Sequence, residues 1–245
     1  MLGAFPSIDK LGRRVIVVLQ GFPCSWGKCR FCPFYLEQST NLRELLEKDR
    51  AIIEEAMRVA DRIAADRVTV FNGGSFFELP LAIIEMLKPL TRGRVVDIES
   101  RPEFLTLDSI LTVMKILSPS KLVIRVGFEC VDEFVRNEVL NKGIPQSEIL
   151  RISKLREQIK ELGLNVNFVA YVLFGIEGIS EELVVKSVKE FSRLFDGVIA
   201  IRYRKYLPNH PNEVAVSKYL REFLEANCLY VDWSEGSEWS ISESS

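Results

Sequence analysis

The sequence GFPCSWGKCRFCPFY, residues Gly21–Tyr35, holds three of the five cysteines of the chain. Cys24, Cys29 and Cys32 are spaced C-x4-C-x2-C, and the apolar run Val15–Leu19 leads directly into them. This order places three thiols on a loop after an expected strand. Three thiolates are one fewer than the ligands of a usual structural zinc site. They suit an iron–sulfur cluster that leaves one iron for a non-protein ligand, so the spacing favours such a cluster.

Two other interpretations of these cysteines stay open at the level of sequence. In the first, Cys130 or Cys228 completes a zinc site, and the chain is a zinc-stabilised, non-catalytic binding protein. In the second, the thiols bind no metal. The only histidine, His210, lies far from the motif in sequence. An odd number of cysteines, three of them clustered, favours reduced metal-binding thiols over a disulfide framework.

The composition predicts one large domain. The 245 residues are 47% hydrophobic and 27% charged, with a net charge of −2. A substantial core is therefore available, and the chain as a whole has no electrostatic attraction for nucleic acid. The first residues lack the long apolar core of a signal peptide, and no apolar run reaches the ~18 residues that span a membrane. We therefore expect a cytoplasmic protein without a membrane segment.

Strand-like and helix-like segments alternate along the chain. The expected strands are Val15–Gly21, Arg67–Asn72, Arg94–Glu99, Lys121–Glu129, Asn165–Phe174 and Val198–Tyr203. The expected helices are Leu42–Ala65, Leu79–Leu90, Thr106–Leu117, Asp132–Leu140, Gln146–Leu162, Glu181–Leu194 and Glu213–Ala226. This alternation predicts an α/β fold with a parallel sheet, either open and doubly wound or closed into an incomplete barrel. Residues 1–230 form the expected domain, and residues 231–245 form an acidic, serine-rich tail.

The cysteine motif resembles the signature of the radical S-adenosylmethionine (SAM) superfamily. That signature is C-x3-C-x2-C with an aromatic residue before the third cysteine; Phe31 takes the aromatic position here, and the first gap is one residue longer. The resemblance implies an incomplete (β/α)6 barrel of parallel strands over roughly residues 12–208. It also implies a 4Fe–4S cluster on Cys24, Cys29 and Cys32, whose open iron binds SAM. One electron, from a ferredoxin- or flavodoxin-type partner, then yields a 5′-deoxyadenosyl radical.

The turn after the second expected strand resembles a further part of the family's site. Asn72, Gly73 and Gly74 match the glycine motif whose backbone meets the amino group of SAM. Glycine suits this role because the backbone has to approach the ligand closely. An ordinary turn is the simpler interpretation of the same residues.

Charged residues and a glycine at the later strand ends complete the expected site. By resemblance, Glu99 and Glu129 bind the amino group and the ribose hydroxyls, and Lys142 or Arg101 binds the methionine carboxylate. A carboxylate accepts two hydroxyl hydrogen bonds at once, which suits a ribose. Gly175, in the sequence GIEG, resembles the segment that packs beside the adenine. Solvated charges and a tight turn are the simpler interpretations. No catalytic acid or base is assigned, because the first step needs none.

The amino-acid sequences of four segments are similar to those of one branch of the superfamily. These segments are FNGGSFF, IESRPEF, VGFE and LNKG. The branch includes the catalytic subunit of elongator and the archaeal radical SAM protein that helps to make archaeosine in tRNA. The resemblance implies a role in tRNA modification, with a partner protein to hold the RNA. A small-molecule substrate, a protein substrate and a catalytically silent partner subunit are the alternatives.

The segment Arg202–Tyr206, RYRKY, ends the sixth expected strand with three basic and two aromatic residues. Strand alternation points Arg202, Arg204 and Tyr206 to one side. One hypothesis is that this set lines the barrel mouth, with arginines on phosphates and Tyr206 stacked on a base. The alternative, which the acidic overall charge favours, is that the set packs under the last helix.

Overall fold

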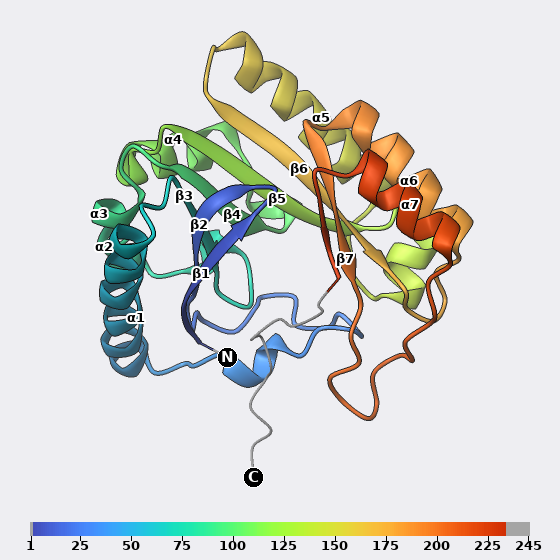
Figure 1. Cartoon of the computed structure of the whole chain (residues 1–245), viewed down its shortest axis with the longest axis horizontal. Coiled ribbons are helices and arrows are strands. Elements are labelled where there is room, and N and C mark those ends of the chain that lie inside the picture. The colour runs from blue at the N-terminus through green and yellow to red at the C-terminus, as the bar shows by residue number, and fades with distance from the viewer. Residues whose placement is uncertain (1, 234–245) are drawn as a thin grey trace.

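The computed structural model describes residues 2–233, and its centre is one eight-stranded sheet with the strand order β1 to β8 (Figure 1). The strands are β1 (Gly3–Asp9), β2 (Gly12–Val18), β3 (Arg67–Phe71), β4 (Val95–Ser100), β5 (Lys121–Glu129), β6 (Val166–Phe174), β7 (Gly197–Arg202) and β8 (Tyr230–Asp232). β1 and β2 pair antiparallel, and every later neighbour pairs parallel.

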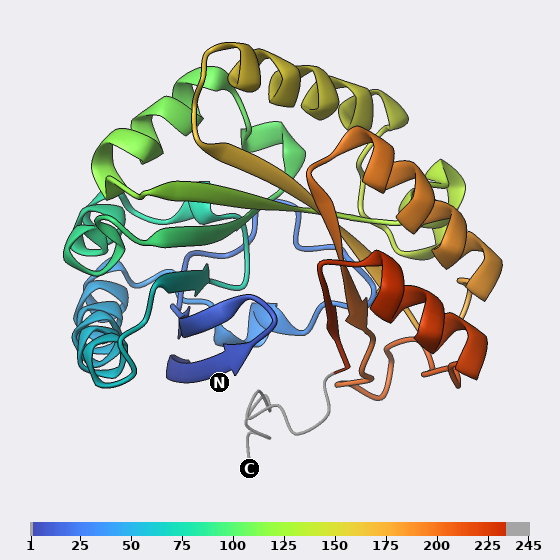
Figure 2. The same cartoon turned by 45° about the horizontal axis from the view of Figure 1, so that its top comes forward.

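The sheet curls into an open half-barrel with the helices along its outer face (Figure 2). The prediction of an incomplete α/β barrel is confirmed. The six expected strands form β2 to β7, and two further strands were not expected. β1 carries Pro6 and stays half-exposed, and β8 spans only three residues, so neither has a strong apolar pattern. The expected tail thus begins within the sheet, and residues 234–245 lie outside the described part.

The long helices lie close to their expected positions. They are α1 (Leu42–Arg62), α4 (Leu107–Leu117), α5 (Gln146–Glu161), α6 (Glu181–Leu194) and α7 (Lys218–Asn227). Asn41 caps α1 as expected, since its side chain accepts a hydrogen bond of 3.3 Å from the backbone N–H of Glu44. Among residues 2–233, no helix is long and apolar enough to cross a membrane.

Three helical predictions need correction. The helix expected at Leu79–Leu90 is two short helices, α2 (Leu81–Met86) and α3 (Lys88–Thr91), because Pro89 interrupts the hydrogen-bond ladder. The helix expected at Asp132–Leu140 is a single π-turn, Val135–Val139. The last helix begins at Lys218 rather than at Glu213, because Ser217 supplies its cap.

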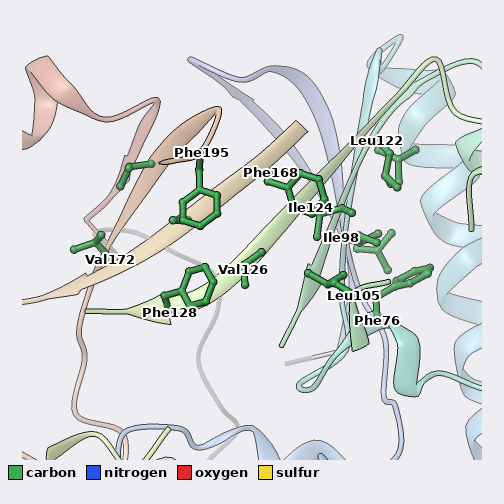
Figure 3. Close-up of a cluster of buried hydrophobic side chains, with 14 of the residues drawn as sticks. Phe76, Ile98, Leu105, Leu122, Ile124, Val126, Phe128, Phe168, Val172 and Phe195 are labelled. Carbon is green, nitrogen blue, oxygen red and sulfur yellow. The ribbon is translucent and has the colours of Figure 1, made fainter. Parts of the chain in front are cut away.

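The main hydrophobic core fills the space between the sheet and the helices (Figure 3). Phe128 of β5 stacks on Phe195 with ring centroids 5.4 Å apart, and Phe191 of α6 lies 5.6 Å from Phe128. Each fully buried phenylalanine contributes about 1.5–3 kcal/mol to folding. This core holds the strands in place while their carboxyl ends remain available for other contacts.

The concave face of the sheet carries a buried ionic cluster. Asp97 of β4 is fully buried and accepts hydrogen bonds from Arg67 at 2.5 and 2.6 Å, from Thr69 at 3.0 Å and from Arg125 at 3.3 Å. Burial raises the pKa of Asp97, but the charges of Arg125 and Arg67 outweigh it, so that the pKa lies below its usual value. The cluster ties β3, β4 and β5 together.

Candidate functional site

The cysteine loop leaves β2 and is fastened to two other segments. The backbone N–H of Ser25 donates to Glu78 at 2.7 Å, which anchors the loop beside the turn after β3. The indole N–H of Trp26 donates to the carbonyl of Asn141 at 2.7 Å, and the Arg30 N–H donates to the Leu140 carbonyl at 3.1 Å. These contacts place the loop across the carboxyl ends of the strands, where α/β barrels carry their chemistry.

Trp26 packs directly on a glycine of the segment that it contacts. Gly143 has a φ of +61°, and a Cβ atom there would lie 2.1 Å from the Trp26 ring. The guanidinium of Arg101 lies 5.2 Å from the centre of the same ring, within range of a cation–π contact. The sequence analysis assigned no role to Trp26. The signal that could have identified it is that Trp26 is the only tryptophan within the cysteine motif.

The three cysteines of the motif are partly buried, and the backbone N–H of Cys32 donates to the Cys29 carbonyl at 3.3 Å. Burial raises the pKa of Cys29, while the positive charges of Lys142 and Arg101 act in the opposite direction. Cys29 and Cys32 line a cavity of about 590 Å³. Among residues 2–233, no three His, Cys, Asp or Glu side chains are arranged to hold a metal ion.

The two remaining cysteines belong to other surroundings. Cys130 is fully buried beside α6, where the Ser187 hydroxyl donates to its sulfur at 3.8 Å. Cys228 caps the end of α7 and packs against the main core. The expectation that Cys130 is a plain buried thiol agrees with these contacts.

The turn Asn72–Ser75 lies against the cysteine loop. A Cβ atom on Gly21 would lie 2.6 Å from the Asn72 carbonyl, and one on Gly74 would lie 3.6 Å from the Cβ of Cys24. Gly73 has a φ of +69°, which favours glycine. The Asn72 side-chain oxygen is buried without a hydrogen-bond partner among the described residues.

Glu129 and Lys142 form a buried ion pair behind the cysteine motif. The Lys142 ammonium lies 3.1 Å from the Glu129 carboxylate and 5.5 Å from the centre of the Phe31 ring. Glu129 has a φ of +66°, an uncommon backbone conformation for a non-glycine residue at the end of β5. The structure thus brings Phe31, Glu129 and Lys142 close together, and their expected contacts with SAM stay a prediction.

Glu99 ends β4 on the concave face of the sheet. Its carboxylate accepts a hydrogen bond from the Tyr171 hydroxyl, which itself accepts one of 3.3 Å from Arg125. Burial raises the pKa of Glu99 to about 7, despite the opposing hydrogen bond from Tyr171. A carboxylate with this pKa changes charge near neutral pH. Sequence analysis did not identify Tyr171.

Arg101 and Gly175 are engaged by the protein itself. The Arg101 side chain donates to Glu103 at 2.5 Å, and its backbone N–H donates to the Ser75 hydroxyl at 2.9 Å. Gly175 has a φ of +72°, and a Cβ atom there would lie 1.4 Å from the Arg202 guanidinium. Glycine at position 175 therefore makes room for an arginine.

The basic segment after β7 binds its own loop. Arg202 donates to the Gly175 carbonyl at 2.5 Å and to the Val214 carbonyl at 2.8 Å. Arg204 contacts Glu213 and Lys205 contacts Asn212, at 3.3 and 2.9 Å. These contacts favour the packing interpretation of the segment over phosphate binding.

His210 lies in the same cavity as Cys29 and Cys32, in the loop that follows β7. Its residue is 8% exposed, and its Nδ1 has no hydrogen-bond partner among residues 2–233. Sequence analysis noted it as the only histidine but assigned it no role. The position of His210 in a loop did not indicate that its side chain would be buried.

Comparisons with known proteins agree with this architecture, although no protein-family model matches the chain. Archaeosine synthase subunit beta of Methanosarcina acetivorans is 26% identical over 197 residues, 76% of this chain and 56% of that protein. An uncharacterised protein of Methanocaldococcus jannaschii is 26% identical over 66% of this chain and 47% of its own. The chain spans about half the length of these curated relatives.

Two solved structures share the fold. Queuine lyase from Clostridium spiroforme, bound to SAM and queuine, has a TM-score of 0.71 at 22% identity and covers 95% of this chain and 94% of that one. The radical SAM enzyme coproporphyrinogen III oxidase from Escherichia coli has a TM-score of 0.54 at 14% identity, over 86% of this chain and 50% of that one. With the archaeosine synthase match, these likenesses confirm the resemblance found in the sequence. The chain thus has the fold of radical SAM enzymes and is similar in sequence to archaeosine synthase subunit beta, which supports a radical SAM protein near the archaeosine branch.

Proposed function

We propose that the chain is a radical SAM enzyme whose Cys24, Cys29 and Cys32 bind a 4Fe–4S cluster. The observation that carries the proposal is that the three thiols share one loop across the carboxyl ends of the strands, where Cys29 and Cys32 line a cavity of about 590 Å³. Three soft thiolate donors fit a cluster with one open iron. When bound and reduced by a ferredoxin- or flavodoxin-type donor, the cluster supplies the electron that cleaves SAM.

The zinc alternative has less support. It needs a fourth ligand, and its candidates Cys130 and Cys228 are packed beside α6 and at the end of α7, respectively. Neither is among the main groups that shift the pKa of Cys29 or Cys32, which are burial and nearby residues such as Lys142 and Cys24. A colourless, zinc-containing protein after anaerobic purification would favour this alternative.

The residues around the motif then bind SAM. An ammonium has three donor protons, and Lys142 gives one to Glu129, so two remain for the methionine carboxylate. Glu99 and Glu129 offer acceptor oxygens to the amino group and the ribose. Asn72 holds a buried, unpartnered oxygen beside Gly73 and Gly74, which suits a ligand that contacts this turn. The buried walls exclude water from the reaction.

We further propose that the substrate is a modified nucleobase, either free or within tRNA. The two relatives with the most informative names support this class, since one makes archaeosine and the other was bound to queuine. The chain resembles most of the queuine-bound structure but only about half of archaeosine synthase subunit beta. If tRNA is the substrate, a partner protein holds it, because Arg202, Arg204 and Lys205 bind residues 212–214 of the protein itself.

Anaerobic reconstitution tests the proposed function. We expect about four irons per chain, a brown protein, and 5′-deoxyadenosine when SAM and dithionite are added. Cys29→Ala should lose iron and activity, whereas Cys228→Ala, the matched control, should keep both. Full iron in Cys29→Ala, or zinc in place of iron in the wild type, would contradict the proposal.

A further inference from the structure

The cavity beside the cysteine loop has a second wall, which joins the GIEG segment to a loop after β7 that the cluster and SAM assignments leave without a role. Gly27–Arg30 and Cys32 form one side, and Glu177, Gly178 and residues 209–211 form another. Both the cysteine loop and the loop between β7 and α7 lie at the same end of the molecule (Figure 1). A ligand in this cavity therefore touches the cysteine loop on one side and the loop that contains His210 on the other.

His210 is held in this wall without a protein partner for its Nδ1. The residue is 92% buried, as its exposure is 8%, and Nδ1 has no hydrogen bond among the described residues. Leaving a buried polar atom unpaired disfavours folding, and most such atoms in native proteins have a partner. A partner that binds in the cavity accounts for the unpaired nitrogen.

The surrounding contacts fix the histidine's loop in place. The Tyr203 hydroxyl donates to the Pro211 carbonyl at 2.8 Å, and the backbone N–H of His210 donates to the Leu207 carbonyl at 3.0 Å. Asn212 donates to the Glu177 carboxylate through its backbone and side chain, at 3.2 and 3.0 Å. The wall is thus built before any ligand arrives, as a preorganised site requires.

The chemistry of the wall suits a planar, neutral ligand with a polar edge. Burial and the nearby charge of Lys205 lower the pKa of His210, so its imidazole is neutral at pH 7 and offers one donor and one acceptor. Glu177 adds acceptor oxygens, Asn209 adds an amide, and Tyr35 adds an aromatic ring to the lining. Enzymes that bind single bases read them through edge hydrogen bonds and aromatic contacts of this kind.

We infer that His210 and Glu177 form the substrate subsite of this cavity and bind the hydrogen-bonding edge of a nucleobase opposite the cysteine loop. The inference rests on the proposed function and adds to it the residues that recognise the substrate. His210 binds the substrate and transfers no proton in the proposed role.

The single histidine makes the test direct, because histidine labelled with ¹³C and ¹⁵N gives one imidazole signal. The reconstituted, unreduced protein with SAM is titrated separately with queuine and with unmodified tRNA. We expect one probe to shift the His210 signal in a saturable manner, and the probe that succeeds distinguishes a free base from a tRNA nucleotide. A signal that neither probe moves overturns the inference.

Variants separate binding from a structural role. His210→Leu should weaken binding of the successful probe about threefold to tenfold, the usual effect of one neutral hydrogen bond. His210→Gln, which keeps a donor and an acceptor, should retain more affinity than His210→Leu, and Asn227→Ala on α7 serves as the unaffected control. Without a ligand, His210→Leu should melt at or above the wild-type temperature, because an unpaired buried nitrogen is removed.

A fall of several degrees in the melting temperature of His210→Leu, or unchanged affinity, overturns the inference. Iron content and SAM cleavage are measured on the same samples. Normal values with an unmoved His210 signal reject only the subsite, whereas absent iron or absent cleavage rejects the proposed function.

Discussion

Buried polar groups on the concave face of the sheet and at its carboxyl edge differ in how completely the protein satisfies them. Asp97, in the middle of the face, accepts four hydrogen bonds from three side chains. Glu129, at the edge, accepts one described hydrogen bond, from Lys142. The oxygens of Asp97 are therefore fully used by the protein, whereas Glu129 and Lys142 can still accept and donate hydrogen bonds to a ligand.

Unpartnered buried atoms among residues 2–233 follow the same division. Side-chain atoms of Asn72 and His210 lie at the edge. Those of Gln20 and Asp49 lie where α1 meets the start of the cysteine loop, because Asp49 of α1 accepts a hydrogen bond from the backbone N–H of Gln20. The fifth, on Arg125, is only 3.2 Å from Asp97 and retains its ionic contact. The centre of the sheet therefore uses buried charge for stability, whereas the edge tolerates unsatisfied groups, as expected of a binding site.

The largest effect should come from Asp97→Ala. Removing this carboxylate leaves Arg67 and Arg125 buried without their counter-ion, and breaking such pairs costs about 3–5 kcal/mol of folding free energy. Urea unfolding monitored by circular dichroism measures the loss. Glu47→Ala, which breaks an exposed pair with Arg43, is the control and should change stability by at most about 1 kcal/mol. Equal losses of folding free energy in Asp97→Ala and Glu47→Ala would contradict the proposed stabilising role of the buried Asp97 cluster.

At the edge, Lys142→Ala should weaken SAM binding, besides the stability lost when Glu129 is left without its buried partner. Loss of a hydrogen bond to a charged group costs about 1.5–3 kcal/mol, roughly 10- to 150-fold in affinity. Equilibrium dialysis of the reconstituted protein with labelled SAM gives the dissociation constant. Lys121→Ala, at the opposite end of β5, is the matched control. Wild-type affinity for SAM in the Lys142 variant would show that the remaining donors of Lys142 do not bind SAM.

The cysteine loop should respond to a single methyl group on Gly143. This glycine and Gly163 share a positive φ, +61° and +67°, but only the Cβ at 143 would meet the Trp26 ring, whereas nothing lies within 4 Å at 163. Gly143→Ala should therefore lose about 1–3 kcal/mol more stability than Gly163→Ala, from overpacking. Denaturant unfolding and iron content after reconstitution are the measurements. Identical losses, with full iron in both, would show that the Trp26 contact does not position the loop.

The parts of the molecule that the sequence predicted are those with local signals. The strands β2 to β7 have continuous apolar runs, and their polar or glycine ends identified Asn72, Glu99 and Glu129 as neighbours. β8 has three residues and therefore no measurable period.

The part of the site that the sequence missed depends on tertiary contacts. The loop that carries His210 is held by Arg202 on the Val214 carbonyl and by Tyr203 on the Pro211 carbonyl, and no periodic pattern encodes such bonds. Trp26 is similar, since its role depends on a glycine more than a hundred positions later in the chain.

The last effect is a dependence of stability on pH and concerns Glu99, which lies between the two regions because Tyr171 links it to Arg125. Burial raises the pKa of Glu99 from 4.5 to about 7, so the folded state holds this proton more tightly than the unfolded state does. The contribution to stability is therefore fully present below pH 4.5 and is lost as the pH rises through about 7. Glu99→Gln has no proton to lose, and its amide oxygen still accepts a hydrogen bond from Tyr171. The stability of Glu99→Gln minus that of the wild type should thus increase between pH 5 and pH 7.5, as measured by thermal unfolding without SAM. If this stability difference stays constant or decreases over the range, Glu99 is stabilised as a charged group, like Asp97 in the centre of the sheet, and the prediction is wrong.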